Sequence, residues 1–411
     1  MPSSTRRRLL ASFAAAGVAG CLGETGGTRS ESTATPTEGF PPPPPTPETP
    51  TDTEPMPTAP DWPVVGADST RRSALDGRAV PATYELRWSF FTHGTPPVVA
   101  GDRVVAVENN REKLLVARDA ETAAVEWTTA LGSEAAAPPT VADGVVYVQR
   151  YTAVEAYDAT TGERRWRTDL GGGAPTAPAV VDGTVYVAQG RHQSPATVAA
   201  LGTDGTVAWT VEPPGEDVSA PAVGPETVAV VVDDQLLAFA RDGAERWRRE
   251  LAGRGARPAV DGDAVVAAGG AQVVVRTAAD GAERWSTGLD GPVGNAGGVA
   301  VDADHVAVGY EGGVTLVNRA DGAVAWSVAT GGPSATPALD ATTVYVGDAG
   351  FEDRRIRALS RSNGEVAWSI RTAKQGRSDV VEGGVRGQPV LVDGGLHVVA
   401  ADGWRAIGRR E

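Results

Sequence analysis

The stretch AYDATTGERRW, residues 156–166, is one copy of a unit that recurs along this 411-residue chain. Shorter copies read RDGAERW at 241–247 and ADGAERW at 279–285. Each copy ends on a tryptophan, and successive tryptophans are 38 to 43 residues apart. The repeat tryptophans are Trp88, Trp127, Trp166, Trp209, Trp247, Trp285, Trp326 and Trp368. A period near 40 with one aromatic residue per unit is typical of a β-propeller.

Each unit divides into four short strands. Before Trp166, the apolar runs VVYVQ and AVEAYD lie between the turns ADG at 142–144 and ATTGE at 159–163. Runs of this kind between Gly and Asp turns are typical of antiparallel hairpins, so one unit predicts one four-stranded blade. Seven complete blades then lie between about Pro96 and Arg371.

The two ends of the array complement each other. After Trp368 the runs QPVLVDG, LHVVA and WRAIG supply three strands, and YELRWSFF at 84–91 supplies one strand without a blade. We therefore predict an all-β, eight-bladed propeller of four-stranded antiparallel blades, in which the N-terminal strand completes the C-terminal blade. Such closure removes free sheet edges.

The repeated residues have a structural explanation. Asp and Gly favour the hairpin before each tryptophan, and an indole can fill the wedge between blades while its N–H reaches a backbone carbonyl. The alternative is that the tryptophans are platforms for a sugar or a quinone. We assign them to blade packing.

Residues 1–21 read as an export signal. Three arginines at 6–8 precede the apolar run LLASFAAAGVAG, which is too short to span a membrane, and the cluster resembles a twin-arginine signal. Val18-Ala19-Gly20-Cys21 resembles a lipobox, which predicts lipidation on Cys21, the only cysteine. An ordinary cleaved signal is the alternative. The lipobox places the protein, exported by the twin-arginine route, on the extracellular face of the cytoplasmic membrane.

Residues 22–60 contain eleven prolines and ten threonines. Such a segment buries too little apolar surface to fold, so we expect a disordered, extended stalk. The globular domain is then 61–411. With 52 acidic against 37 basic residues, the net charge of −15 disfavours nucleic acid as a partner. The scarcity of lysine gives the chain a composition that resembles proteins of halophilic archaea, although a GC-rich genome would also favour arginine over lysine.

The stretch at 156–166 matches A-x-D-x-x-T-G-x-x-x-W at every fixed position, and residues 117–127 match except for Ala123. Together with Trp62-Pro63, this resembles the PQQ-like propellers, which include quinoprotein dehydrogenases and BamB-type assembly lipoproteins. The resemblance covers about 61–411. In the dehydrogenases it implies PQQ and Ca²⁺ in the channel, an aspartate base and, in alcohol oxidisers, a disulfide between adjacent cysteines. This chain has no such cysteine pair, and no base, calcium ligands or other metal-ligand motif can be assigned.

The BamB-type resemblance implies a lipid anchor, eight blades and no catalytic residues. We therefore expect a monomeric, non-catalytic scaffold, without a cofactor, that binds a protein or glycan at the cell surface. The alternative is a PQQ- and Ca²⁺-dependent dehydrogenase of alcohols or sugars. A third reading, a solute- or polysaccharide-binding disc, would need clustered aromatics such as Tyr151, Tyr310 and Phe351.

Long loops predict the binding face. They fall at 108–113, 189–196 and 347–355, between second and third strands, and at the crossing 372–387. Variable solvated loops without a ligand are the alternative reading. The candidate binding residues are Arg111, Arg191, His192, Asp348, Glu352, Arg354, Arg355, Lys374, Arg377 and Arg386.

Overall fold

The computed structural model divides the chain into two compact units, residues 1–49 and 50–411. The residues that it describes all lie in the second unit, at 66–68, 70–74, 84–90, 94–109, 112–190, 195–294, 297–348, 354–372, 384–385, 387–392, 395–400 and 403–409. The predicted export signal, Cys21 and the stalk lie outside these ranges. Within them, no helix is long and apolar enough to cross a membrane.

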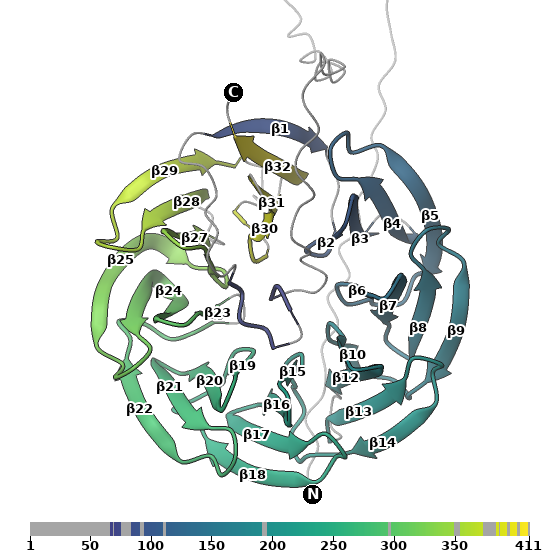
Figure 1. The fold of residues 1–411 in the computed structure, drawn as a ribbon, viewed down its shortest axis with the longest axis horizontal. Helices are drawn as coiled ribbons and strands as arrows, with labels where there is room; N and C mark the ends of the chain where they lie inside the picture. The colour runs from purple at the N-terminus through teal and green to yellow at the C-terminus, as the bar shows by residue number, and fades with distance from the viewer. Residues whose placement is uncertain are drawn as a thin grey trace, which may run out of the picture. The chain divides into compact units, whose positions relative to one another are not determined.

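The described residues form eight antiparallel blades arranged as a ring (Figure 1). The first blade contains β2 (Val98–Ala100), β3 (Arg103–Asn109), β4 (Lys113–Asp119) and β5 (Val125–Gly132). The second contains β6 (Thr140–Ala142), β7 (Val145–Gln149), β8 (Ala153–Asp158) and β9 (Arg164–Asp169). The third contains β10 (Ala174–Pro175), β11 (Ala179–Val181), β12 (Thr184–Gly190), β13 (Thr197–Gly202) and β14 (Val207–Val211). The fourth contains β15 (Ala222–Val223), β16 (Thr227–Val232), β17 (Gln235–Ala240) and β18 (Glu245–Glu250).

The fifth blade contains β19 (Ala259–Asp261), β20 (Ala264–Gly269), β21 (Gln272–Thr277) and β22 (Glu283–Gly288). The sixth contains β23 (Gly298–Val301), β24 (His305–Asn318) and β25 (Val324–Pro333). Because the first half of β24 pairs with β23 and the second half with β25, this one long strand takes the second and third positions. The seventh contains β26 (Ala338–Leu339), β27 (Thr343–Gly347), β28 (Arg355–Ser360) and β29 (Val366–Arg371).

The eighth blade confirms the predicted closure. It contains β30 (Val390–Val392), β31 (Gly395–Ala400), β32 (Gly403–Arg409) and β1 (Tyr84–Phe90), with β1 as the outermost strand. β1 runs antiparallel to β32 from Tyr84 opposite Arg409 to Phe90 opposite Trp404. The N-terminal strand therefore hydrogen-bonds to the last strand of the chain and closes the ring.

The repeat tryptophans connect neighbouring blades. The indole N–H of Trp127 donates to the carbonyl of Ala159, 2.9 Å away, in the last turn of the next blade. Equivalent bonds of 2.7 to 2.9 Å, each to the following blade, are made by Trp166, Trp209, Trp247, Trp285 and Trp326. Trp368 is buried between the seventh and eighth blades. The side chain of Trp88 is not among those that the structure describes.

Two constraints favour glycine in the repeat turns, namely a left-handed backbone conformation and a close approach to an indole. Gly162 has a φ of +72°, and a Cβ at this position would lie 2.5 Å from Cε3 of Trp127. Gly205, Gly243, Gly281, Gly322 and Gly364 approach the preceding blade's indole in the same way. Ala123 takes the glycine position of the first blade with a φ of 59°, which is strained for a residue with a Cβ.

Apolar clusters fill the remaining space between blades. For example, Val231 and Leu236 of the fourth blade share one buried cluster with Val260 and Val265 of the fifth. Because the strands carry mostly Val and Ala, the blades are packed by small side chains, and the indole is the largest group at each contact.

We predict that Trp247→Ala lowers the free energy of unfolding by about 3–5 kcal/mol, because this large side chain is only 5% exposed. It also leaves the Ala278 carbonyl without its indole donor. Urea unfolding followed by circular dichroism measures the change. Val366→Ala is the control, since Val366 is 51% exposed, and should change stability by less than about 0.5 kcal/mol. Equal losses in both variants would contradict the packing role.

Candidate functional site

The two ends of the blades differ. Short turns at one end connect first to second strands, as between Ala142 and Val145. At the other end, each crossing between blades pairs with a turn between second and third strands, through the bridges Ala136–Arg150, Val218–Val232, Gly255–Gly269 and Ser334–Asp348. We call this second end the crossing face. It is the face on which the sequence predicts a binding site.

Three of the ten candidate binding residues are described. Asp348 and Arg354 are buried, at 0% and 5% exposed, and Arg355 places its Nη1 2.8 Å from the Ser369 hydroxyl. The backbone N–H of Asp348 donates to the carbonyl of Arg355, so these residues hold the loop of the seventh blade. Their role in binding stays a prediction. The others lie outside the described residues: Arg111, Arg191, His192, Glu352, Lys374, Arg377 and Arg386.

Residues 66–68 and 70–74 cross the middle of the ring, where Figure 1 shows them in purple. Their backbone is bound to the innermost strands of successive blades. The carbonyls of Thr70, Arg72 and Ser73 accept from the N–H groups of Val260, Val301 and Leu339, respectively. Ala74 also forms a parallel bridge with Leu339. The central channel of the propeller is therefore occupied by the chain itself.

Arg71 anchors this segment. Its side chain is 0% exposed, with Nη2 2.8 Å from the Ala177 carbonyl and 2.7 Å from that of Pro178, in the third blade. Nε donates to the carbonyl of Pro221 in the fourth blade, at 3.1 Å. Burial, and secondarily the positive charge of Arg257, holds the pKa of Arg71 well below its ordinary value. The guanidinium thus bridges the third and fourth blades.

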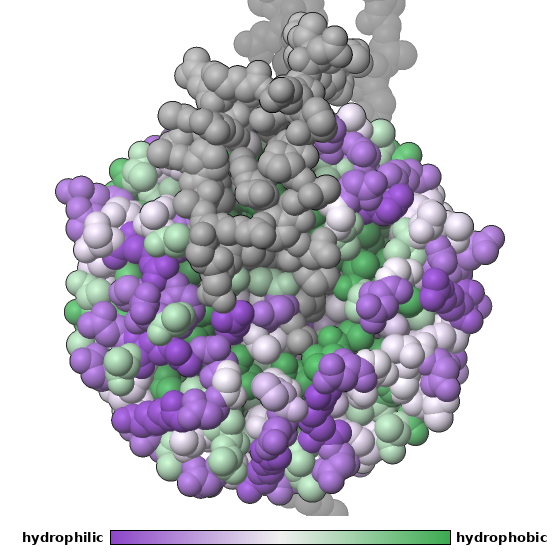
Figure 2. Space-filling model, viewed as in Figure 1, coloured by the Kyte–Doolittle hydropathy of each residue, from purple (hydrophilic) through white to green (hydrophobic). Residues whose placement is uncertain are grey.

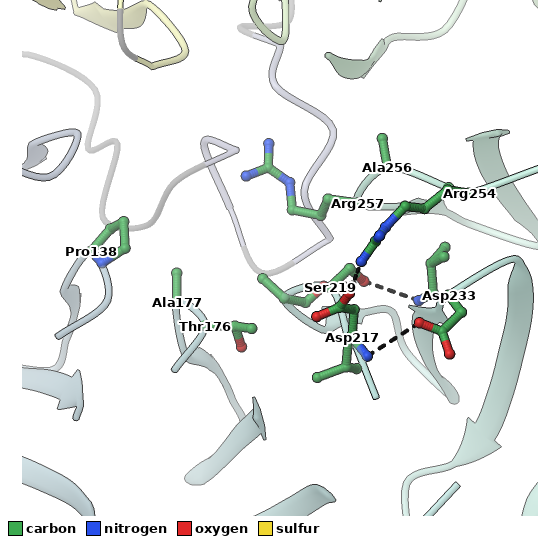
Figure 3. Close-up of a pocket in the computed structure, with 13 residues that line it drawn as sticks. Pro138, Thr176, Ala177, Asp217, Ser219, Asp233, Arg254, Ala256 and Arg257 are labelled. Carbon is green, nitrogen blue, oxygen red and sulfur yellow. Dashed lines mark hydrogen bonds and ion pairs between the residues drawn. The ribbon is translucent and has the colours of Figure 1, made fainter. Parts of the chain in front are cut away.

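A cavity of about 430 Å³ opens beside this anchor on the crossing face. Its lining comes from the second to the fifth blade, and part of it is labelled in Figure 3. The lining residues are Pro138, Thr176, Ala177, Asp217, Val218, Ser219, Ala220, Val231, Asp233, Arg254, Gly255, Ala256 and Arg257. In Figure 2 hydrophilic residues dominate the periphery of the ring in this view, and hydrophobic ones are visible nearer its middle.

Both carboxylates of the cavity lining, Asp217 and Asp233, have partners nearby. The Asp217 carboxylate pairs with Arg254, and the Asp233 carboxylate accepts from the backbone N–H groups of Glu216 and Asp217 at 3.1 and 3.2 Å. The sequence does not single out these residues, because Asp217 and Arg254 lie on crossings of ordinary length and Asp233 lies in a short turn between β16 and β17.

Arg257 is the remaining charged residue of the cavity lining. Its Nη2 lies 2.9 Å from Oε1 of Gln388, which in turn donates to the carbonyl of Pro337 at 3.2 Å. Burial lowers the pKa of Arg257 to about 10. Figure 3 shows the guanidinium turned away from Asp217 and Asp233.

The second blade contains a buried charge cluster of a different kind. Glu155 is 0% exposed and accepts from Arg150 at 3.1 Å, from Arg167 at 2.7 Å and from the Tyr157 hydroxyl. Burial raises the pKa of Glu155, but its bonds to Tyr157 and Arg167 outweigh this effect, and the pKa is lowered. Because its charge is neutralised, this cluster reads as part of the blade framework.

The described residues contain no group of three or more His, Cys, Asp or Glu side chains that could hold a metal ion. His397 is 3% exposed in β31, where burial lowers its pKa to about 4. His305 lies with Nδ1 2.7 Å from Nη2 of Arg361. Neither histidine belongs to a group that could hold a metal ion within this part of the chain.

Comparison with known proteins agrees with this architecture. A family model described as "Outer membrane protein assembly factor BamB" matches residues 62–154, 150–242 and 233–407. The chain belongs to this BamB-type family of PQQ-like propellers. No curated protein sequence matches the chain.

Solved structures share the fold. BamB from Moraxella catarrhalis is 19% identical, with a TM-score of 0.63 over 80% of this chain and 100% of that one. The quinohemoprotein alcohol dehydrogenase from Comamonas testosteroni is 14% identical, with a TM-score of 0.67 over 86% and 81%. The computationally designed Ika8 protein is also 14% identical, with a TM-score of 0.67 over 79% and 98%. At these identities the likeness shows the fold alone, and BamB and the dehydrogenase have different functions.

We predict that Arg71→Met lowers the free energy of unfolding by about 2–4 kcal/mol, since three buried carbonyls lose their donor. Hydrogen exchange should also accelerate at the amides of Val260 and Val301, which donate to the segment. Mass spectrometry of exchanged peptides measures this. Arg284→Gln is the control, because it removes a surface ion pair to the exposed Asp263 and should leave both observables unchanged. Unchanged exchange in Arg71→Met would contradict the anchoring role.

Proposed function

We propose that this protein is a lipid-anchored propeller, exported by the twin-arginine route and held on the extracellular face of the cytoplasmic membrane. There it binds a protein or glycan partner and catalyses no reaction. The observation that carries the non-catalytic part is the occupation of the channel by residues 66–74. Scarce lysine and the acidic surface further favour a halophilic archaeon as the source.

The channel residues do not fit a PQQ and calcium centre. A flat, multi-ring cofactor needs an open slot, whereas Arg71 fills the space between the third and fourth blades and is bonded to their carbonyls. Ca²⁺ needs six to eight oxygen ligands with several carboxylates. The described residues bring no such carboxylate group together.

Binding is supported by the crossing face. The candidate residues Arg111, Arg191, His192, Glu352, Lys374, Arg377 and Arg386 belong to loops that the sequence assigns to this face, and loops are where propellers vary most freely. The family description names an outer-membrane assembly factor. A role in outer-membrane assembly is not proposed for this chain, because a halophilic archaeon has no outer membrane.

The alternative is a PQQ- and Ca²⁺-dependent dehydrogenase of alcohols or sugars. It is favoured by the similarity to a quinohemoprotein alcohol dehydrogenase, which is as strong in TM-score as any reported above. A direct assay separates the two functions.

We predict no dye-coupled oxidation of ethanol or glucose by the purified protein in molar KCl with Ca²⁺ and PQQ. The reason is that Arg71 fills the space between the third and fourth blades, and the backbone of its segment is bonded to the innermost strands of the fifth, sixth and seventh. Reduction of an artificial electron acceptor, followed by absorbance, measures turnover. A PQQ-dependent alcohol dehydrogenase run in parallel is the positive control. Turnover that requires both PQQ and Ca²⁺ would establish the alternative.

We predict that Cys21→Ser releases the protein from cells into the medium, because Cys21 is the only residue that could carry the lipid. Immunoblots of membrane and medium fractions measure the change. Ser12→Ala, within the same signal, is the control and should remain with the membrane. Continued membrane association of the Cys21 variant would refute the anchor without affecting the propeller itself.

A further inference from the structure

Arg257 combines three features that favour an anionic ligand. It lines the cavity of about 430 Å³, its guanidinium has Gln388 as a neutral partner, and no ion pair to a carboxylate is formed by it within the described residues. A desolvated cation without a counterion is costly, so such a group is favoured when a ligand supplies the negative charge.

The surroundings strengthen the positive field at this point. Arg71 is a second guanidinium close to Arg257, and its pKa is lowered first by burial and then by the charge of Arg257, while the charge of Asp68 raises it. The two carboxylates of the cavity are committed elsewhere, Asp217 to Arg254 and Asp233 to two backbone N–H groups. Asp233 keeps its negative charge, but the Arg257 guanidinium is turned away from both carboxylates (Figure 3), so an anion on that side would meet the cation first.

The rest of the lining limits what that anion can be. Pro138, Ala177, Val218, Ala220 and Ala256 contribute small apolar surfaces, and the described lining contains no aromatic side chain. A large planar anion would find no ring to stack on, and inorganic phosphate would leave the apolar surface unused. A carboxylate on a small aliphatic body matches both the cation and the walls.

We propose that this cavity binds an aliphatic carboxylate, free or at the C-terminus of a peptide, with its oxygens on the Arg257 guanidinium. Gln388 positions the guanidinium from the eighth blade, and Arg254 with Asp217 forms the outer rim. The site goes beyond the proposed partner binding, because it lies on short crossings that contribute none of the candidate loop residues. It is also independent of the lipid anchor.

The test uses the full-length protein and two matched pairs of probes. Isovalerate is compared with isovaleramide, and N-acetyl-Ala-Val with its C-terminal amide, by isothermal titration calorimetry. We expect saturable binding of a carboxylate and at least about tenfold weaker binding of its neutral amide, as for a charge-assisted bond. If isovalerate binds, the free acid is sufficient, and if only N-acetyl-Ala-Val binds, the carboxylate must be carried by a peptide.

Substitutions at Arg257 test whether this residue binds the carboxylate. Arg257→Gln should weaken binding of the carboxylate roughly tenfold or more, and Arg257→Lys should retain part of it. Arg284→Gln is the matched control, because Arg284 pairs with the exposed Asp263 outside the cavity lining, and should change affinity by less than about threefold. Circular dichroism and thermal unfolding of each variant establish that it is folded.

Three results would overturn the proposal. One is that neither carboxylate binds to the folded wild-type protein at millimolar concentration. Another is that carboxylate and amide bind equally. The third is that Arg257→Gln, folded as the wild type is, keeps full affinity. None of these results affects the release of the Cys21 variant or the PQQ assay, so failure here is distinguishable from failure of the proposed function.

Discussion

The bond from an indole N–H to a carbonyl of the next blade is the interaction on which the rest of the ring depends. It is repeated from Trp127 to Trp326 at 2.7 to 2.9 Å. Each bond requires the following blade to present its last turn in one position, and the left-handed glycine in that turn lets the backbone approach the ring. Tryptophan and glycine therefore act as one unit across a blade boundary, although they are far apart in sequence.

A ring built from such contacts has to be closed and filled. The pairing of β1 with β32 closes it by joining the two ends of the domain. Residues 66–74 fill it, and their contacts run from the third to the seventh blade through Arg71, Thr70, Arg72 and Ser73. Since the same segment precedes β1 in the chain, the N-terminal part of the domain both closes the ring and ties its inner strands together.

The repeated features of the fold could be predicted from the sequence, and the single features could not. Eight tryptophans at a regular spacing define eight blades, and one strand at the N-terminal end with three at the C-terminal end defines the closure. Arg71 lies in STRRS, which has neither a repeat nor an apolar pattern, so nothing distinguished it from a surface arginine. Its burial depends on carbonyls of Ala177, Pro178 and Pro221, more than 100 residues away.

The candidate site shows the same limit. Loop length points to the end of the blades at which the cavity opens but to different residues, because Asp217, Arg254 and Arg257 lie on crossings of ordinary length. Of the loop residues that are described, Asp348 and Arg354 turned out to be buried. Length reports how much chain is free to vary, whereas a cavity forms where neighbouring blades diverge, and this geometry is not encoded in any one loop.

The charges of the cavity also differ from those of the surface in how they respond to salt. The chain carries a net charge of −15, which on its own would repel an anionic ligand. At molar ionic strength the Debye length falls to about 3 Å, so distant surface carboxylates are largely screened. A guanidinium inside a cavity is screened much less, because ions do not fit between it and a ligand in direct contact. Arg257 would therefore keep its attraction for a carboxylate under the conditions that suppress the general repulsion, which makes a cation in a cavity wall a suitable anion site for an acidic protein in salt.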